Sequence, residues 1–143
     1  MITKLEKTLY LKDSSIFDEI PAKDLYDISH YLEEKDFSKN DYIFKDGDDG
    51  DSMYFILSGD IDIMKVNTKL VSLRKGEYFG EMALLDGETR SADAICTQDS
   101  ILLKLKSNDF NRIMYSNEKI VKGILKMLSQ RLRKANQLIH KKR

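Results

Sequence analysis

The stretch from Phe79 to Ala92 reads F-G-E-M-A-L-L-D-G-E-T-R-S-A and is the most informative part of the chain. Its order predicts a strand ending at Phe79, a tight turn at Gly80, a short helix from Glu81 to Leu85, and a break before Arg90. Short polar and apolar segments alternate over these fourteen residues. The stretch therefore predicts a loop-and-helix insertion between two strands.

The side chains of this stretch suit a small anion that also carries a hydroxyl group. A phosphate is held by backbone N–H groups at a helix start and by the fork of an arginine, here Arg90. Ser91 and Ala92 are small enough to let their backbone approach a ligand closely. Glu81 would repel a phosphate, so its useful role is to accept a hydrogen bond from a hydroxyl. Together these residues favour a ribose 3′,5′-cyclic phosphate.

An ordinary strand–turn–helix–strand connection is the competing interpretation of the same residues. In that case Gly80 only makes the turn, Glu81 only favours the helix start, and Arg90 is solvated. Each residue alone fits this interpretation well. The complete ordered set favours a binding site.

The residues around this stretch predict a mainly β protein. Turn signals separate short runs rich in β-branched and aromatic residues, and some runs alternate with polar residues as half-buried strands do. We expect an antiparallel β-roll, a jelly roll or double-stranded β-helix, with N-terminal helices and a long C-terminal helix. The predicted strands are Tyr42–Phe44, Met53–Leu57, Ile61–Val66, Leu70–Leu73, Ala92–Thr97 and Ile101–Leu105.

Helical signals occupy the region before residue 37. Thr3 and Glu6 have the spacing of a capping box, which predicts a helix over Ile2–Lys12. Pro21 suits the start of a helix, and apolar residues at helical spacing extend the prediction from Ala22 to Leu32.

Helical signals return after residue 106. Ser107 is expected to cap a helix through Tyr115, and Asn117 to cap a long helix that follows. An apolar seam with a 3.5-residue spacing runs along the long helix, which is typical of packing against a partner helix. The seam residues are Val121, Leu125, Leu128, Leu132, Ala135 and Ile139. We expect the first half of this helix to pack on the roll and the second half on a partner or on bound ligand. A homodimer through this helix is predicted.

Length and composition fit one domain, residues 1–143. We divide it into a helical segment 1–36, a β-roll 37–106 that holds the 79–92 stretch, and C-terminal helices 107–143. Lys plus Arg equals Asp plus Glu at 24 each, so no basic field indicates nucleic acid. The basic tail from Arg131 onward is interpreted as a solvated helix face.

Several other classes of protein are not expected. The N-terminus has no apolar signal-peptide core and no run is long enough to span a membrane. One cysteine, Cys96, fits a reducing cytoplasm and core packing. His30 and His140 lie far apart in the sequence, so no metal or cofactor is expected. No nucleophile lies beside a plausible base, so the chain is not expected to be an enzyme.

Two stretches together resemble the cyclic nucleotide-binding domain family of catabolite activators, kinase regulatory subunits and gated channels. The first is residues 79–92. The second is residues 44–60, F-K-D-G-D-D-G-D-S-M-Y-F-I-L-S-G-D, whose Gly47 and Gly59 match the family's turn glycines. The resemblance covers Phe17 to Ile139 and implies the family's β-roll fold and a cyclic nucleotide ligand.

The resemblance also implies roles for individual residues of this phosphate-binding cassette, residues 79–92. Gly80 and Glu81 match the pair that holds the ribose 2′-hydroxyl, and Arg90 matches the arginine of the cyclic phosphate. The ligand-binding set is completed by the backbone amides of the small pair Ser91 and Ala92, by the Ser91 hydroxyl, and by backbone groups of the short helix. These further residues are Phe79, Met82, Ala83, Leu84, Ser91 and Ala92. Thr89 departs from the proline that many members place before the arginine.

The resemblance predicts cAMP rather than cGMP, because Ser91 is similar to the bacterial cAMP pattern. It also implies that the C-terminal helix closes over the base, with Arg133, Asn136 or Gln137 as possible base contacts. We expect the chain to act on a separate effector protein. Two alternatives stay open: the truncated sensor domain of a transcription regulator, which would need a helix-turn-helix after residue 143, and a roll that binds only proteins. A cupin-type enzyme is not expected, because the sequence lacks the clustered His and carboxylate ligands of that class.

Overall fold

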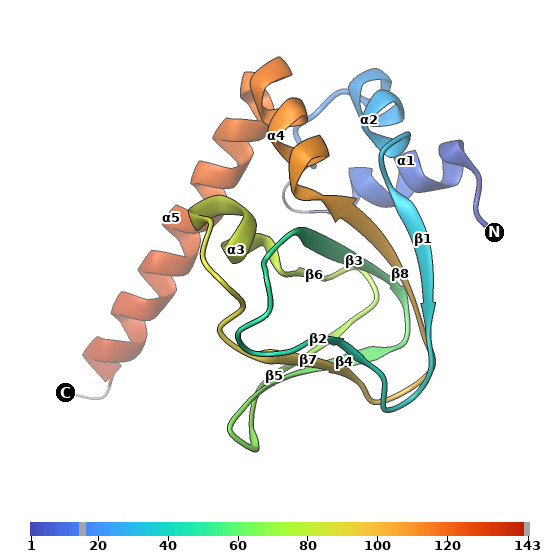
Figure 1. Ribbon diagram of the computed structural model, residues 1–143. Coiled ribbons are helices and arrows are strands. Elements are labelled where there is room, and N and C mark those ends of the chain that lie inside the picture. The colour runs from blue at the N-terminus through green and yellow to red at the C-terminus, as the bar shows by residue number, and fades with distance from the viewer. Residues whose placement is uncertain (15–16, 142–143) are drawn as a thin grey trace.

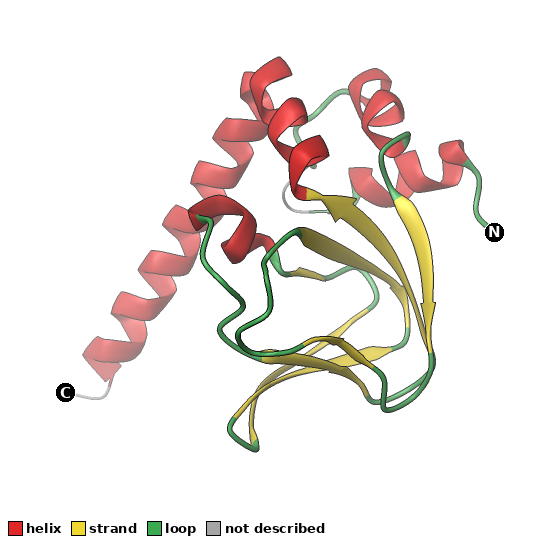
Figure 2. Ribbon diagram, viewed as in Figure 1, coloured by secondary structure: helices red, strands yellow, loops and turns green. Residues whose placement is uncertain are grey.

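A computed structural model describes residues 1–14 and 17–141, and Figure 1 shows their arrangement. Two four-stranded antiparallel sheets form a roll, with strand orders β1-β8-β3-β6 and β2-β7-β4-β5. The helices gather on one side of the roll, and the long α5 extends away from it (Figure 2). This arrangement confirms the predicted fold class.

The strands follow the alternation in the sequence closely. All six predicted strands are present, with ends shifted by two residues at most, and β6 lies just ahead of the cassette. Their bounds are β1 Glu33–Phe37, β2 Tyr42–Phe44, β3 Ser52–Ser58, β4 Asp60–Lys65, β5 Thr68–Arg74, β6 Tyr78–Phe79, β7 Asp93–Cys96 and β8 Ser100–Lys106.

The helices begin where the caps predict, with one exception. Thr3 accepts from the Glu6 backbone at 3.1 Å and Glu6 accepts from the Thr3 backbone at 3.2 Å, so the capping box is confirmed. Asn117 accepts from the Lys119 backbone at 3.0 Å at the start of α5. Ser107 is the first helical residue and not the cap, which is Lys106. The bounds are α1 Lys4–Lys12, α2 Ala22–Ser29, α3 Glu81–Asp86, α4 Ser107–Ser116 and α5 Glu118–Lys141.

The N-terminal region differs from the prediction in two places. Helix α2 ends at Ser29 and not at Leu32, and β1 lies mostly inside the segment 1–36 that was expected to be helical. The β1 residues, E-E-K-D-F, are mostly charged and lack the composition of a strand. These residues form a strand because the backbone of β1, an edge strand, pairs with β8 from Glu33 to Phe37.

Strand β3 divides the interior into two cores. Met53 and Phe55 face the helices, while Tyr54 and Ile56 face the inside of the roll, as a period of two requires. Burying one such side chain contributes about 1.5–3 kcal/mol. Cys96 lies in the roll core, as predicted, and burial raises the pKa of its thiol. Phe79, the first residue of the cassette, packs in the same roll core.

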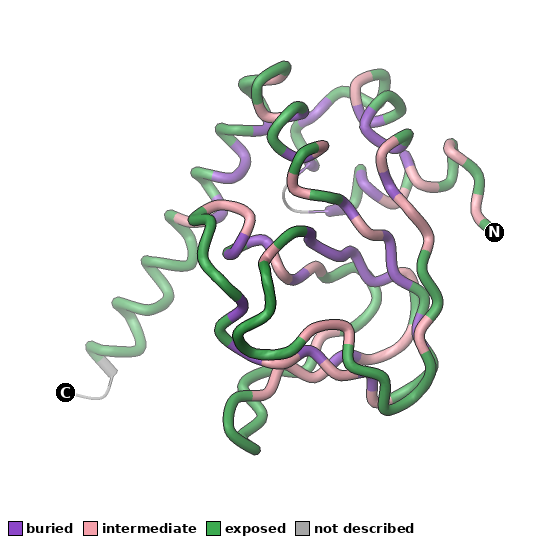
Figure 3. Tube along the Cα trace, in the orientation of Figure 1, coloured by how far each residue is buried: buried purple, intermediate pink, exposed green. Residues whose placement is uncertain are grey.

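Helix α5 changes character along its length. Ile120, Ile124 and Met127 are buried against the core, as expected for its first half. From residue 131 to residue 140 the helix is exposed (Figure 3), and Leu132 of the apolar seam is 64% exposed. No helix among the described residues is long and apolar enough to cross a membrane.

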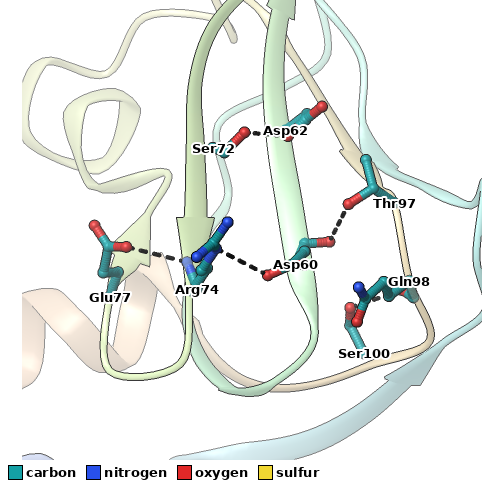
Figure 4. Close-up of polar contacts among 8 residues, drawn as sticks. All are labelled: Asp60, Asp62, Ser72, Arg74, Glu77, Thr97, Gln98 and Ser100. Carbon is teal, nitrogen blue, oxygen red and sulfur yellow. Dashed lines mark hydrogen bonds and ion pairs between the residues drawn. The ribbon is translucent and has the colours of Figure 1, made fainter.

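Polar contacts fix the turn that leads from β5 into the cassette (Figure 4). Ser72 donates to Asp62 at 2.6 Å across β4 and β5. Arg74 pairs with Asp60 at 3.5 Å, and its backbone N–H donates to Glu77 at 3.1 Å. The first two contacts join β4 to β5, and the third closes the turn directly before β6.

Candidate functional site

A cavity of about 630 Å³ lies between the cassette, the β4–β5 hairpin and α5. Its volume is in the range of small-molecule sites. Ile63 pairs with Val71 across β4 and β5, and Leu73 follows on the same face of β5, so one side of the cavity is apolar. The complete lining is Phe44, Ile63, Val71, Leu73, Tyr78, Phe79, Gly80, Glu81, Met82, Ala83, Asp86, Glu88, Thr89, Arg90, Ser91, Ala92 and Arg131.

Gly80 connects β6 to α3 in a conformation that favours glycine. Its φ is 86°, in the left-handed region. A Cβ at this position would lie 2.8 Å from Nη1 of Arg90 and 3.2 Å from the Ser52 carbonyl. The turn and the close approach of the arginine both require a residue without a side chain.

Arg90 lies inside the site and is only 4% exposed. Nη1 donates to the Gly80 carbonyl at 2.9 Å, Nη2 donates to the Ser52 carbonyl, and the guanidinium lies 4.0 Å from the centre of the Phe44 ring. Nε is buried and has no hydrogen-bond partner among the described residues. The interpretation of Arg90 as a solvated residue is therefore wrong.

Burial has an electrostatic consequence for Arg90. Desolvation lowers the pKa of the guanidinium, and Tyr54 and the carboxylates of Asp51, Asp48 and Glu81 act in the opposite direction. The two groups that accept its hydrogen bonds are neutral carbonyls, and no carboxylate forms a direct ion pair with it among the described residues. A buried cation of this kind is suited to receive an anion.

Glu81 lies in the first turn of α3 and is 5% exposed. Its Oε1 pairs with Nη1 of Arg131 on α5 at 2.5 Å. The sequence interpretation placed Arg131 on a solvated basic face, and this is corrected by the ion pair, although Arg131 remains 46% exposed. Lys142 and Arg143 of the same basic tail lie outside the described residues.

The loop after β2 holds the cassette from the other side. The Gly47 backbone donates to the Arg90 carbonyl at 2.8 Å, and the Arg90 backbone donates to the Asp48 carbonyl at 2.8 Å. A Cβ on Gly50 would lie 2.1 Å from the Cβ of Ala83. The loop between β2 and β3, within the glycine-bearing stretch 44–60, is therefore a structural support for the cassette, as the sequence indicated.

Most of the predicted site residues line this cavity, with four exceptions. Leu84 packs against the helix-side core. Arg133, Asn136 and Gln137 are exposed and lie outside the lining of the described cavity. Arg131 takes their place because it follows the buried Met127 by four residues and shares its helix face.

Sequence reasoning missed the apolar side of the cavity and its link to α5. Ile63, Val71 and Leu73 were interpreted only as strand residues, although their alternation already placed them on one face. Tyr78 also lines the cavity, and its hydroxyl contacts the sulfur of Met127 on α5. Strand alternation could have found the first group, and the four-residue spacing from Met127, on the apolar face of the helix, could have pointed to Arg131.

Comparisons with known proteins agree with this geometry. The family model described as "Cyclic nucleotide-binding domain" matches residues 34–117. The cAMP-dependent protein kinase regulatory subunit of Hypocrea atroviridis is 33% identical over 105 residues, which cover 73% of this chain and 23% of that protein. The Cyclic AMP receptor protein of Thermus thermophilus is 28% identical over 131 residues, covering 88% of this chain and 61% of that protein.

Solved structures show the same fold. The Thermus thermophilus Catabolite Activator Protein superposes with a TM-score of 0.80 and 27% identity, covering 89% of this chain and 62% of that one. The regulatory domain of Toxoplasma gondii PKA with cAMP gives a TM-score of 0.78 and 25% identity, covering 89% and 50%. The chain thus spans about a quarter of the length of the first of these curated relatives and about three fifths of the length of the second.

Proposed function

Because this chain belongs to the cyclic nucleotide-binding domain family, we propose that its cavity binds cAMP, with cGMP as the weaker ligand. The observation that carries the proposal is Arg90, a buried guanidinium at the cavity whose Nε has no hydrogen-bond partner among the described residues. A monoanionic cyclic phosphate beside it would supply the charge and the acceptor that the surrounding carbonyls do not.

The proposed orientation matches each part of the ligand to the residues that line the cavity. The phosphate lies at Arg90 and at the backbone of Ser91 and Ala92, and the ribose 2′-hydroxyl donates to Glu81. The base then lies toward the apolar side formed by the β4–β5 hairpin. Each part of the nucleotide meets a surface of matching chemistry, which supports this assignment.

The preference for cAMP rests on Ser91 and on similar proteins. A kinase regulatory subunit and a bacterial receptor whose names refer to cAMP are among the relatives. The cGMP-dependent protein kinase 2 of Homo sapiens is also similar, at 28% identity over 79% of this chain and 16% of that protein. Ligand competition therefore has to include cGMP.

Signalling by α5 is the second part of the proposal. Glu81 is the residue that would accept from the ribose, and it already pairs with Arg131 of α5. A ligand that binds at Glu81 meets the helix at the same carboxylate. If two positions of α5 differ in their affinity for the nucleotide, binding shifts the population between them.

The remaining parts of the proposal concern partners and setting. The exposed apolar seam of α5 is proposed to form a homodimer, and the helix position to be sensed by a separate effector protein. We propose that the chain catalyses no reaction, contacts no nucleic acid and is located in the cytoplasm.

Sedimentation equilibrium of the wild type and of Leu132→Asp tests the dimer, because a charge in the seam would dissociate it. Equal masses for the two proteins would contradict it.

Calorimetric titration with cAMP, cGMP and 5′-AMP tests the binding proposal. The wild type is expected to bind cAMP most tightly. Arg90→Ala should weaken cAMP binding by about 2–5 kcal/mol, the range for losing one partner of a buried charge pair. Arg112→Ala, which removes an exposed arginine of α4, is the control and should bind normally. Equal affinity for cAMP and 5′-AMP, or normal binding by Arg90→Ala, would refute the proposal.

A further inference from the structure

Lys65, at the end of β4, contacts the peptide that joins Ser91 to Ala92. Its Nζ donates to the Ser91 carbonyl at 2.7 Å and lies 3.3 Å from the Asp46 carboxylate. Ser91 and Ala92 line the cavity, whereas Lys65 lies outside the lining of the described cavity. The Ser91 carbonyl is thus held toward a group that does not line the cavity.

The contact between Lys65 and the Ser91 carbonyl also fixes the direction of the Ala92 N–H group, because both groups belong to one planar peptide. Every peptide bond in the described residues is trans, and in a trans peptide the C=O and N–H bonds point to opposite sides. A Ser91 carbonyl directed toward Lys65 therefore directs the Ala92 N–H away from Lys65. Because Ala92 lines the cavity and Lys65 does not, we infer that this side is the cavity side.

We propose that Lys65 is a positioning residue for the anion, which acts by orienting the Ala92 N–H toward the phosphate. This inference rests on the proposed binding of a cyclic nucleotide and adds a residue from outside the cassette. Lys65 does not touch the ligand, and its effect passes through the Ser91 carbonyl.

The surroundings of the peptide support this role. Asp46 holds Lys65 through its carboxylate, while its backbone N–H donates to the Asp93 carboxylate at 2.7 Å. Arg90, one residue before the peptide, is fixed through both of its backbone groups to the loop after β2. The segment is therefore tied on both sides of the Ser91–Ala92 peptide, and Lys65 sets the rotation of the peptide between them.

The exposure of the ion pair predicts where the effect of Lys65 will be measured. The side chains of Lys65 and Asp46 are 49% and 45% exposed, and pairs of this kind contribute little to folding. Loss of Lys65 should therefore change ligand affinity far more than the melting temperature.

The experiment compares Lys65→Met with Lys69→Met, which removes the same charge from an exposed position on the neighbouring strand β5. Titration with cAMP should show about tenfold weaker binding for Lys65→Met, equivalent to one hydrogen bond. The cAMP affinities of Lys69→Met and Lys65→Arg should stay within about threefold of the wild type. Lys69→Met keeps the contact between Lys65 and Ser91, and Lys65→Arg keeps a hydrogen-bond donor at that position.

Two further readouts distinguish positioning from simple charge. In the wild type, the ¹⁵N–¹H resonance of Ala92 should shift when cAMP binds, and Lys65→Met should lose most of this shift. Cyclic phosphorothioates, with sulfur in place of one exocyclic oxygen or the other, should be discriminated less well by Lys65→Met. A directed N–H distinguishes the two oxygens, and a distant charge does not.

The outcomes separate the inference from the proposed function. If the wild type binds cAMP but Lys65→Met and Lys69→Met weaken it equally, or if the Ala92 shift survives in Lys65→Met, Lys65 acts only as a charge and the inference is refuted. If the wild type binds no cyclic nucleotide, the proposed function is refuted and the inference with it.

Discussion

Replacing Gly80 by alanine should damage both folding and ligand binding, and the structure allows the two effects to be separated. Gly76 provides the matched control. Its φ is 91°, close to the 86° of Gly80, but no described atom lies within 4 Å of a Cβ added there. Gly76→Ala therefore carries the backbone cost alone, whereas Gly80→Ala also meets Arg90.

The expected magnitudes follow from these contacts. A left-handed backbone costs a non-glycine residue about 1–2 kcal/mol, which is the whole effect expected for Gly76→Ala. At Gly80 the new methyl group would lie 2.8 Å from Nη1 of Arg90, so the guanidinium must move and lose its hydrogen bond to the Gly80 carbonyl. A hydrogen bond to a charged group contributes about 1.5–3 kcal/mol. Gly80→Ala should therefore lower the free energy of unfolding by about 2.5–5 kcal/mol.

Urea denaturation measures the folding effect, and calorimetric titration with cAMP measures the binding effect. Gly80→Ala should bind cAMP at least about tenfold more weakly, because Arg90 no longer lies where the phosphate needs it. Gly76→Ala should bind within about threefold of the wild type. If the two variants lose the same stability and the same affinity, the close approach of Gly80 and Arg90 does not matter and the reasoning is wrong.

Three further perturbations test other parts of the structure. Arg131→Met should abolish the cAMP-dependent change in distance between spin labels on α5 and on the roll, measured by double electron–electron resonance. Arg133→Met, the control of equal charge, should preserve that change, and equal behaviour of the two variants would contradict the role of the ion pair. Gly50→Ala places a methyl group 2.1 Å from Ala83 and should cost about 1–3 kcal/mol in urea denaturation. Ala83→Gly in the same chain should recover part of that loss, and an absence of recovery would mean that this contact is not the cause. Burial raises the pKa of Tyr10 from 10.0 to about 12, so the unfolded chain loses this proton first. The stability that Tyr10 contributes should thus be complete below pH 10 and decrease up to pH 12. Thermal melts at increasing pH should show that Tyr10→Phe removes this decrease, and an identical dependence of the melting temperature on alkaline pH in both proteins would exclude Tyr10 as its source.

Local patterns were sufficient wherever one element determines its own form. The capping box of Thr3 and Glu6 needs only one helical turn, and the six predicted strands were visible from their alternation and turn residues. The order of the cassette likewise brought Gly80, Glu81 and Arg90 to one cavity, because its short helix and two turns leave the chain little freedom. The signals that mark these elements span few residues, so the sequence alone contains them.

The edge strand β1 shows where local patterns fail. Its residues are charged and have no strand-like composition, but its backbone hydrogen bonds are completed by β8, more than sixty residues away. The same holds for Ser107, whose expected capping role passes to the strand residue before it, because β8 continues to Lys106. A partner distant in the sequence overrides the local preference.

Local patterns of residues predicted the β-roll, the cassette, and the presence in it of both a carboxylate and an arginine, which suits a ribose cyclic phosphate. The folded chain added that Arg90 is buried, that Arg131 lines the cavity whereas Arg133, Asn136 and Gln137 do not, and that Lys65 contacts the cassette peptide. These contacts depend on the rotation of α5 about its axis and on the register between strands, and both are set by packing over the whole roll.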